Sequence, residues 1–473
     1  MIRLITWILA LIPEVALAQG KAPWVYDVTI IPGGRELKVV ATFGTKSPGK
    51  IVVKPGAAPF VRDLEQATAT GFVPLKKAQE KSPAQTQDSW LPGACPKGGC
   101  KVRYVFALAD AAAALADFDM VAEQYGIFVS DPGAWLIHSM APPEQQEARV
   151  HITAPPGTIF ATGLFPTDAP NTYRTTADWL DSMPMTLIGS AQLHRFELKG
   201  GTIDVVIAKA NYGVNEGAIL SWAQRAASAV EKYFDDYPVP HSLLYIRPQG
   251  ANGGGVSYGG GGAVSVIPLQ LTAKEDDLRA DWVMTHEMVH LAFPSVHGDH
   301  HWIEEGIATY VEPIARLRTK ELKPGRVLQD MIVGLPQGLP EPGDEGLDHT
   351  HTWGRTYWGG ALFCFLADVE LRKRSGGKFG FEHALRGILA AGGDVSVEWE
   401  LNRALVAADH ATGIPVLKEL YDKMKDKPYS VDLNALWKDL GVLRDAAGAF
   451  SGFDDSAPLA YVRKAIISGE PGR

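Results

Sequence analysis

The chain has 473 residues, of which 46% are hydrophobic and 21% are charged, and its formal net charge is −9. This composition is ordinary for a globular protein, and the length allows roughly two to four domains. The negative charge and the lack of a block rich in Lys and Arg speak against nucleic acid as a partner.

The first residues follow the pattern of an export signal. Arg3 supplies a positive charge, residues 4–12 are almost entirely apolar, and Ala16-Leu17-Ala18 is a small-residue cleavage site. This apolar run is too short to cross a bilayer, and no other run reaches that length. A buried segment of the mature fold is the alternative. We expect residues 1–18 to be a signal peptide, the mature chain to have no membrane span, and the protein to be exported, either periplasmic or secreted.

Residues 19–200 are expected to form a β-sandwich-like domain. Residues 24–30 and 36–41 are rich in β-branched side chains, and residues 101–105 and 148–152 alternate polar and apolar positions.

Two segments interrupt this pattern, and two cysteines follow the second. Residues 107–118 could form a helix, and residues 76–93 are mostly polar and are expected to be a surface loop. Cys95 and Cys100 flank a Pro-Lys-Gly-Gly turn that a disulfide could close in an oxidising compartment. Half of a zinc site is the alternative, but no second cysteine pair completes it. Cys364 lies in an apolar run and is expected to be an inert core residue.

The pattern changes near Thr202. Strands are expected at residues 202–208, 242–246 and 263–269, and a helix over residues 218–234, whose apolar positions recur at helical spacing. Between the second and third strands, eight of the thirteen residues 250–262 are glycine.

Helices dominate the remainder. We expect them at residues 278–293, at residues 302–318 with a kink at Pro313, at residues 357–374, and several more between residues 381 and 440. The expected organisation is therefore α+β and multidomain, with a catalytic α/β domain over residues 201–330 and a helical region over residues 331–473.

Residues 286–290 read His-Glu-Met-Val-His. Two histidines four apart on a helix project from one face, so His286 and His290 can bind a single metal ion. Glu287 can then take a proton from a metal-bound water. Catalytic zinc needs a third protein ligand, and Glu304 and Glu305 are the candidates. Neighbouring helical side chains point about 100° apart, so only one of the two glutamates can face the metal.

His-Glu-x-x-His followed by Trp-x-x-Glu-Gly resembles the gluzincin metallopeptidases, specifically the membrane alanyl and glycyl aminopeptidase families. The resemblance covers about residues 202–442 and, more loosely, the β-domain before them. It implies a thermolysin-like catalytic domain, one Zn²⁺ ion, and Glu305 as the third ligand, because the glutamate directly before glycine has that role in these families. The linker of fourteen residues between His290 and Glu305 is shorter than the alanyl aminopeptidase pattern.

The resemblance extends to Tyr357, which lies two residues before a Gly-Gly step at the start of an apolar helix. In these families the equivalent hydroxyl stabilises the oxyanion, and a phenol that is neutral at pH 7 suits this task. A core aromatic at a helix start is the alternative.

Other polar residues near the motif have weaker claims. A metzincin is excluded because Phe293 and Val296 stand where its pattern needs glycine and histidine. The remaining candidates are His297, His300 and His301, expected as a solvated rim from which one could donate to substrate, and Glu312, which could orient a ligand or simply be exposed.

The glycine-rich segment is either a flexible surface loop or the substrate-binding edge strand of gluzincins, to which a peptide could add through its main chain. In the aminopeptidases that strand carries a glutamate that holds the free amine of the substrate. Residues 262–265, which the resemblance places there, contain no acid. Asp276, Asp277 or Asp281 could substitute from nearby.

The sequence thus predicts an exported zinc metallopeptidase that acts on peptides or proteins, with aminopeptidase specificity left open. Zinc on His286, His290 and Glu305 would activate water, Glu287 would move the proton, and Tyr357 would stabilise the oxyanion. The alternatives are a non-catalytic peptide-binding or envelope-assembly protein and a zinc hydrolase of a non-peptide substrate.

Overall fold

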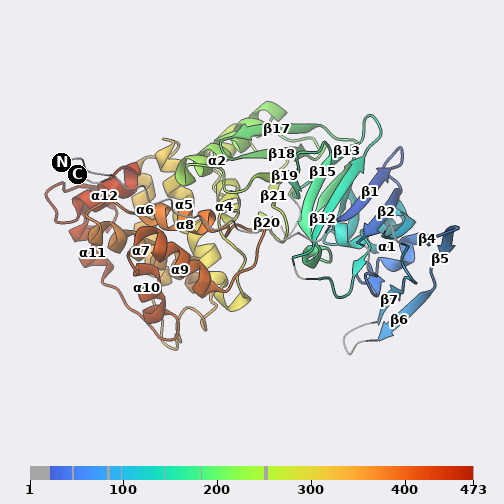
Figure 1. Ribbon diagram of the computed structural model, residues 1–473. Coiled ribbons are helices and arrows are strands. Elements are labelled where there is room, and N and C mark those ends of the chain that lie inside the picture. Colours follow the sequence, from blue (N-terminus) through green and yellow to red (C-terminus); the bar gives the residue numbers. More distant parts are fainter. Residues whose placement is uncertain are drawn as a thin grey trace, which may run out of the picture.

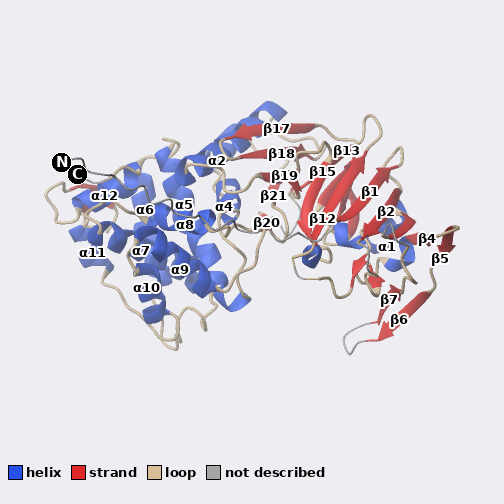
Figure 2. Cartoon of the chain, in the orientation of Figure 1, coloured by secondary structure: helices blue, strands red, loops and turns tan. Residues whose placement is uncertain are grey.

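The computed structural model describes residues 22–471 except 45–46, 82–85, 97–98, 144, 183 and 250–253. The export signal expected at residues 1–18 therefore lies outside the described residues. Figure 1 shows an elongated molecule, with the N-terminal strands at one end, helices at the other and a further sheet between them. Figure 2 shows the same division by secondary structure. In the described part of the chain, no helix is long and apolar enough to cross a membrane.

The N-terminal strands enclose a core of their own. In the largest sheet the strand order is β14-β15-β12-β1-β2-β8-β4-β5, and among the described residues β1 and β12 are its only parallel pair of neighbours. Along β1 every second side chain, from Trp24 to Ile30, is buried, which leaves the other face to solvent. Its strands are β1 Trp24–Ile30, β2 Leu37–Phe43, β4 Val61–Thr68, β5 Gly71–Pro74, β8 Cys100–Phe106, β12 Glu147–Thr153, β14 Phe165–Pro166 and β15 Thr172–Thr176.

Two smaller sheets and a helix complete this part. Helix α1 (Leu108–Leu115) forms where the sequence allowed one. The sheets have the orders β13-β16-β10-β9 and β11-β3-β7-β6. Their strands are β3 Ile51–Val52, β6 Lys77–Lys81, β7 Thr86–Trp90, β9 Val121–Gln124, β10 Ile127–Ser130, β11 His138–Ser139, β13 Ile159–Thr162 and β16 Thr186–Gly189.

The surface loop expected at residues 76–93 is wrong in part, because β6 and β7 pair there as an antiparallel hairpin. The register joins Lys77 to Trp90 and Gln79 to Asp88. A strand pair with polar side chains lacks the apolar alternation by which a strand is recognised in a sequence. Cys95 and Cys100, just beyond this hairpin, are joined by a disulfide.

A central sheet of strand order β17-β18-β19-β21-β20 connects the two ends of the molecule. Alternate residues of β19 face opposite sides: Leu244 and Ile246 pack with the helices, whereas Leu243 and Tyr245 pack against the N-terminal strands. The sheet is therefore buried on both faces. Its strands are β17 Leu193–Leu198, β18 Gly201–Ile207, β19 His241–Pro248, β20 Val256–Tyr258 and β21 Val264–Leu269.

The glycine-rich segment contains the edge strand, which was one of its two expected roles. The edge is β20, inside the glycine-rich segment, and it pairs antiparallel with β21. Residues 262–265, expected at the edge, lead into β21 in the sheet interior, between β19 and β20. The glycine-rich segment is thus in part a strand and not wholly a loop. The sequence could not distinguish the two positions because both segments are short and rich in valine and serine.

The helix expected over residues 278–293 is two helices, α3 (Glu275–Ala280) and α4 (Val283–His290). Asp281 adopts an extended conformation between them, and its side chain accepts a hydrogen bond from the amide of Met284, 3.0 Å away. Because aspartate at this position satisfies a free amide of the next helix, it starts a new helix instead of continuing the first.

The other helices largely follow the expectations. Pro313 lies inside the uninterrupted helix α5, and α6 was not foreseen. A π-helical turn at Gly354–Gly359 precedes α7. The elements are α2 Glu216–Phe234, α5 His301–Arg318, α6 Pro324–Gly334, α7 Gly360–Arg374, α8 Phe381–Ala390, α9 Leu401–Thr412, α10 Val416–Met424, α11 Leu433–Asp439, α12 Ala460–Ser468, and the short strands β22 Val442–Arg444 and β23 Phe450–Phe453.

The predicted fold class is confirmed: β-structure at the N-terminus, a central α/β part and helices at the C-terminus. One cluster of buried side chains extends from Ile203 to Ile466 and includes Cys364. Residues assigned to the catalytic domain and to the helical region therefore pack around a common core. The domain limits at residues 200 and 330 stay a prediction.

Candidate active site

Helix α4 presents both motif histidines from one face. The ring centroids of His286 and His290 lie 4.9 Å apart, one helical turn from each other. The Asp281 cap sets the start of α4, and α5 and the central sheet pack against its sides. The two imidazoles therefore lie next to each other because of local helix geometry alone.

Helix α5 brings a glutamate to the histidines. Glu305 Oε2 lies 3.1 Å from His286 Nε2 and 3.7 Å from His290 Nε2. Ligand atoms of these three residues all lie within 4.8 Å of one another. Glu304 points elsewhere: its oxygens accept from the amide of Val296 at 3.3 Å and lie 2.9 Å from His301 Nδ1. The structure thus separates two glutamates that the residue pattern alone could not.

The charge states suit a metal ion. Burial lowers the pKa of His290 to about 3, which keeps its imidazole neutral. Burial would raise the pKa of Glu305, but hydrogen bonds with His286 and then His301 hold it well below its usual range. Neutral imidazole and ionised carboxylate are the forms that bind metal.

The donor set fits catalytic zinc. Among the residues that the structure describes, no fourth His, Cys, Asp or Glu side chain joins this group. Structural zinc sites are usually closed by four protein ligands, whereas catalytic sites have three and one open position. Two imidazoles and one carboxylate are a known catalytic set.

Glu287 lies between the three candidate metal ligands and the edge strand. Burial raises the pKa of Glu287 to about 7, in the range that suits a group that accepts and returns protons. A Cβ atom at Gly255 would lie 2.9 Å from Glu287 Oε1, so only glycine lets the strand approach this closely. Ser257 Oγ donates to the carbonyl oxygen of Glu287 at 2.7 Å and lies 3.0 Å from Ser265 Oγ. The edge strand is therefore hydrogen-bonded to the metal-motif helix.

Tyr357 faces the same site from the π-helical turn. Its ring lies 6.4 Å from that of His286, at an interplanar angle of 23°. Burial, and then the charges of Glu305 and Glu287, raise the pKa of Tyr357, so its hydroxyl is protonated at neutral pH. π-Helical turns often occur at functional sites because they redirect a side chain within a helix.

A contact between two glycines places this turn against α5. A Cβ at Gly306 would lie 2.4 Å from the Cα of Gly360, and one at Gly360 would lie 2.0 Å from the carbonyl oxygen of Trp302. Helices α5 and α7 can therefore approach at backbone distance only because both positions are glycine. The contact brings Glu305 and Tyr357, from different helices, to one site.

These residues line a cleft of about 590 Å³ along the edge strand. Its apolar wall includes Val283, Phe293 and Val395. At one end the amides of Gly260 and Gly261 donate to the carbonyl oxygens of Val395 and Ser396, at 3.2 and 2.8 Å. The free edge of the sheet is thus open along β20 and covered beyond it.

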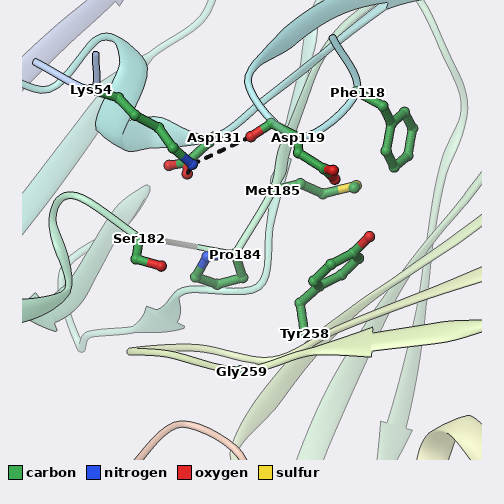
Figure 3. Close-up of a pocket in the computed structure, with 9 residues that line it drawn as sticks. All are labelled: Lys54, Phe118, Asp119, Asp131, Ser182, Pro184, Met185, Tyr258 and Gly259. Atoms are coloured by element: carbon green, nitrogen blue, oxygen red, sulfur yellow. Dashed lines mark hydrogen bonds and ion pairs between the residues drawn. The ribbon is translucent and has the colours of Figure 1, made fainter. Parts of the chain in front are cut away.

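A smaller pocket lies on the other side of β20, next to the N-terminal strands (Figure 3). Tyr258 and Phe118 face each other across it, and Lys54 and Asp131, which also line it, form an ion pair. Gly259 lines both this pocket and the cleft, so the end of the edge strand separates the two.

The remaining candidates have structural partners. His297 is largely exposed, whereas His300 Nδ1 lies 3.0 Å from Asp348, a buried acceptor of the Trp302 indole. Glu312 accepts a hydrogen bond from Arg316 at 2.8 Å, so a role in orienting a ligand stays a prediction.

The three aspartates considered as amine anchors are used locally. Asp277 accepts from the amide of Lys274 and Asp281 from that of Met284, while Asp276 is exposed and pairs with Arg279. Among the described residues that line the cleft, none of these three is found.

Val395 was not expected at the site, because its position there comes from contacts with a segment far along the chain. Gly255 and Ser257 belong to the glycine-rich segment, for which a substrate-binding edge strand was one of the two expectations.

No sequence profile of a known family matches the chain, and no curated protein matches it in sequence. In structure it is similar to an aminopeptidase N family protein from Idiomarina loihiensis, with a TM-score of 0.62 and 16% identity over 92% of this chain and 82% of that one. It is also similar to an M1 zinc metallopeptidase from Deinococcus radiodurans, with a TM-score of 0.51 and 15% identity over 87% and 94% of the two chains. A two-domain M1 zinc metallopeptidase variant bound to L-arginine gives a TM-score of 0.50 and 15% identity over 87% and 95%. The chain has the fold of these structures, and the expected resemblance is confirmed at that level.

Proposed function

We propose that this protein is an exported zinc-dependent metallopeptidase, with one zinc ion held by His286, His290 and Glu305. The observation that carries the proposal is the cluster of ligand atoms within 4.8 Å, open to a cleft that Glu287 and Tyr357 also line. A closed structural site would need a fourth ligand and would have no use for Glu287.

The chemistry follows from the positions of the side chains. Zinc in such a site lowers the pKa of a bound water and polarises the carbonyl that is attacked. Glu287 accepts the proton of the attacking water and returns it to the leaving amine. The hydroxyl of Tyr357 donates a hydrogen bond to the carbonyl oxygen as negative charge develops there.

A peptide is the substrate class that the cleft favours. Within the described part of the chain β20 pairs with β21 alone, so its other edge offers main-chain groups to which an extended peptide can add as a further strand. The names of the similar structures, an aminopeptidase N family protein and an enzyme bound to L-arginine, support cleavage near a chain end. The covered end of the cleft at Val395 fits this specificity, because it limits how far a bound peptide can extend.

Export is supported by two features. Residues 1–18 have the composition of a signal peptide, and the disulfide between Cys95 and Cys100 is a bond that persists in oxidising compartments. We place the mature protein in the periplasm or outside the cell.

The test compares wild type with Glu287→Gln in zinc content and in digestion of a peptide library. We expect one zinc per chain in both, and a loss of kcat in the variant of about 10²–10⁴-fold, the usual contribution of a general base. A chelator should abolish activity, and added zinc should restore it. Glu275→Gln, an exposed site on α3, is the matched control and should behave as wild type.

Equal activity in wild type and Glu287→Gln would overturn the proposal, as would purified protein without zinc affinity. Zinc binding without peptide cleavage would leave the two alternatives, a binding protein or a hydrolase of another substrate. If cleavage requires a free N-terminus, the activity is that of an aminopeptidase.

A further inference from the structure

His301, the first residue of α5, lies between two consecutive glutamates of its own helix. Its Nδ1 lies 2.9 Å from Glu304 Oε2, and its Nε2 lies 3.3 Å from Glu305 Oε1. The side chain is about half exposed and also lines the cleft. One imidazole therefore joins the proposed zinc ligand Glu305 to its neighbour in sequence, although the two glutamates point in different directions.

The contact with Glu304 holds the His301 ring in place. Glu304 accepts through its other oxygen from the amide of Val296, at 3.3 Å. Each ring nitrogen of His301 thus faces a carboxylate oxygen, Nδ1 that of Glu304 and Nε2 that of Glu305. Rotation of the ring would break both bonds at once. The orientation of His301 is therefore fixed by backbone at Val296, through Glu304.

The two carboxylate oxygens of Glu305 have different neighbours, which decides which of them can bind metal. Oε1 is occupied by His301, whereas Oε2 is the oxygen near His286 Nε2 and His290 Nε2. We propose that His301 is a positioning residue that holds the Glu305 carboxylate with Oε2 toward the two histidines. This inference rests on the proposed zinc site and assigns a residue outside its ligand set.

Electrostatic repulsion between His301 and a bound metal ion opposes this role. A cationic imidazole near a divalent cation is repulsive, so removing it could in principle strengthen binding. The carboxylate of Glu304 lies 2.9 Å from the ring and offsets this repulsion. Residues that orient a metal ligand typically contribute about 10–100-fold to metal affinity. We therefore expect orientation to outweigh repulsion.

The experiment measures zinc affinity of the full chain by competition with a chelator. His301→Ala removes both hydrogen bonds, and His301→Gln retains one amide that can donate to Glu305. His297→Ala is the matched control, because His297 lies shortly before α5 and is largely exposed, and within the described part of the chain its only ion pair is with Asp299. Visible absorption of the cobalt-substituted proteins reports the geometry of the metal site, and thermal unfolding of the metal-free proteins checks that each variant folds.

We expect His301→Ala to bind zinc about 10–100-fold more weakly than wild type, with an altered cobalt spectrum. His301→Gln should recover part of the loss, and His297→Ala should match wild type in both measurements. Unchanged or tighter zinc binding by His301→Ala would overturn the proposal. A raised KM with unchanged zinc affinity would also overturn it and would assign His301 to substrate binding instead.

The two proposals fail differently. If wild type binds zinc but cleaves no peptide, the peptidase function is wrong while the affinity comparison still tests His301. If wild type is active and His301→Ala retains full zinc affinity, only the role of His301 is wrong.

Discussion

The position of Tyr357 defines what its hydroxyl can contribute. The ring stacks against Trp353, with ring centroids 5.6 Å apart, and against His286, with centroids 6.4 Å apart. A rigid ring directs its hydroxyl at one point, and a preorganised donor needs no rearrangement as charge develops on the substrate.

Tyr357→Phe should therefore lower kcat by about 10²–10³-fold, the loss seen when one oxyanion donor is removed. Zinc content and KM should change little, because the ring and its stacking remain. Steady-state kinetics with a defined peptide and metal analysis measure the two effects. A variant with wild-type kcat would assign Tyr357 to packing, the alternative that its sequence context also allowed.

Among elements, the approach of α5 to α7 determines the site most directly. Glu305 lies on α5 and Tyr357 lies on the π-helical turn that leads into α7, and the glycines at 306 and 360 allow the backbones of the two helices to touch. Larger residues would separate the helices and move the two functional groups apart. The same kind of close approach, at Gly255, keeps the edge strand beside Glu287.

Gly306→Ala should destabilise the protein by about 1–3 kcal/mol and weaken zinc binding, because the added methyl group meets backbone atoms that cannot rotate away. Gly298→Ala is the control: a Cβ there has no neighbour within 4 Å among the described residues. Urea unfolding and chelator competition give the two quantities. Equal stability of both variants would show that α7 can shift without cost.

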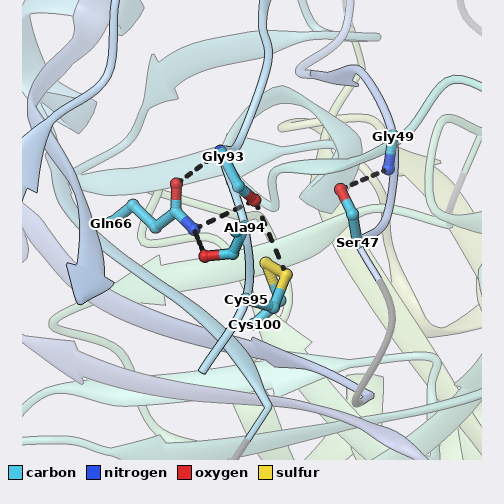
Figure 4. The surroundings of a disulfide bond; sticks show 7 residues. All are labelled: Ser47, Gly49, Gln66, Gly93, Ala94, Cys95 and Cys100. Atoms are coloured by element: carbon cyan, nitrogen blue, oxygen red, sulfur yellow. Dashed lines mark hydrogen bonds between the residues drawn. A yellow bond between two sulfur atoms is a disulfide. The ribbon is translucent and has the colours of Figure 1, made fainter. Parts of the chain in front are cut away.

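At the scale of the whole molecule, the two ends have separate cores joined through the central sheet. The N-terminal core includes Cys100 and Trp135. The helical core includes buried side chains of α4, the helix that carries His286, and of α5. The disulfide between Cys95 and Cys100 lies in the N-terminal part, where Figure 4 shows it near Gln66 and Gly93. We expect the disulfide to stabilise the N-terminal part and to leave the cleft unaffected.

The double variant Cys95→Ser/Cys100→Ser should lose about 2 kcal/mol of stability, the chain-entropy value for so short a loop. Its kcat and zinc content should equal those of wild type. Wild type in the presence of a thiol reductant should show the same loss, which separates the bond from the substitution. A drop in activity at unchanged stability would show that the two ends are coupled through the central sheet.

Much of the fold followed from local pattern. Helices α2 and α5 and strands β1, β2 and β18 were expected within a few residues, because apolar periodicity depends only on neighbours in the chain. The polar hairpin of β6 and β7 and the break at Asp281 were missed. Both depend on pairing or capping contacts that leave no apolar period in the sequence.

By itself, the sequence determined the placement of His286, Glu287 and His290 on one helix, since residues four apart on a helix share a face. Family resemblance added Glu305 and Tyr357. Only the tertiary structure decided which glutamate meets the histidines, which strand forms the edge and what closes the cleft at Val395. These features join residues tens to more than a hundred positions apart. Their geometry comes from the packing of whole elements, which no local pattern encodes.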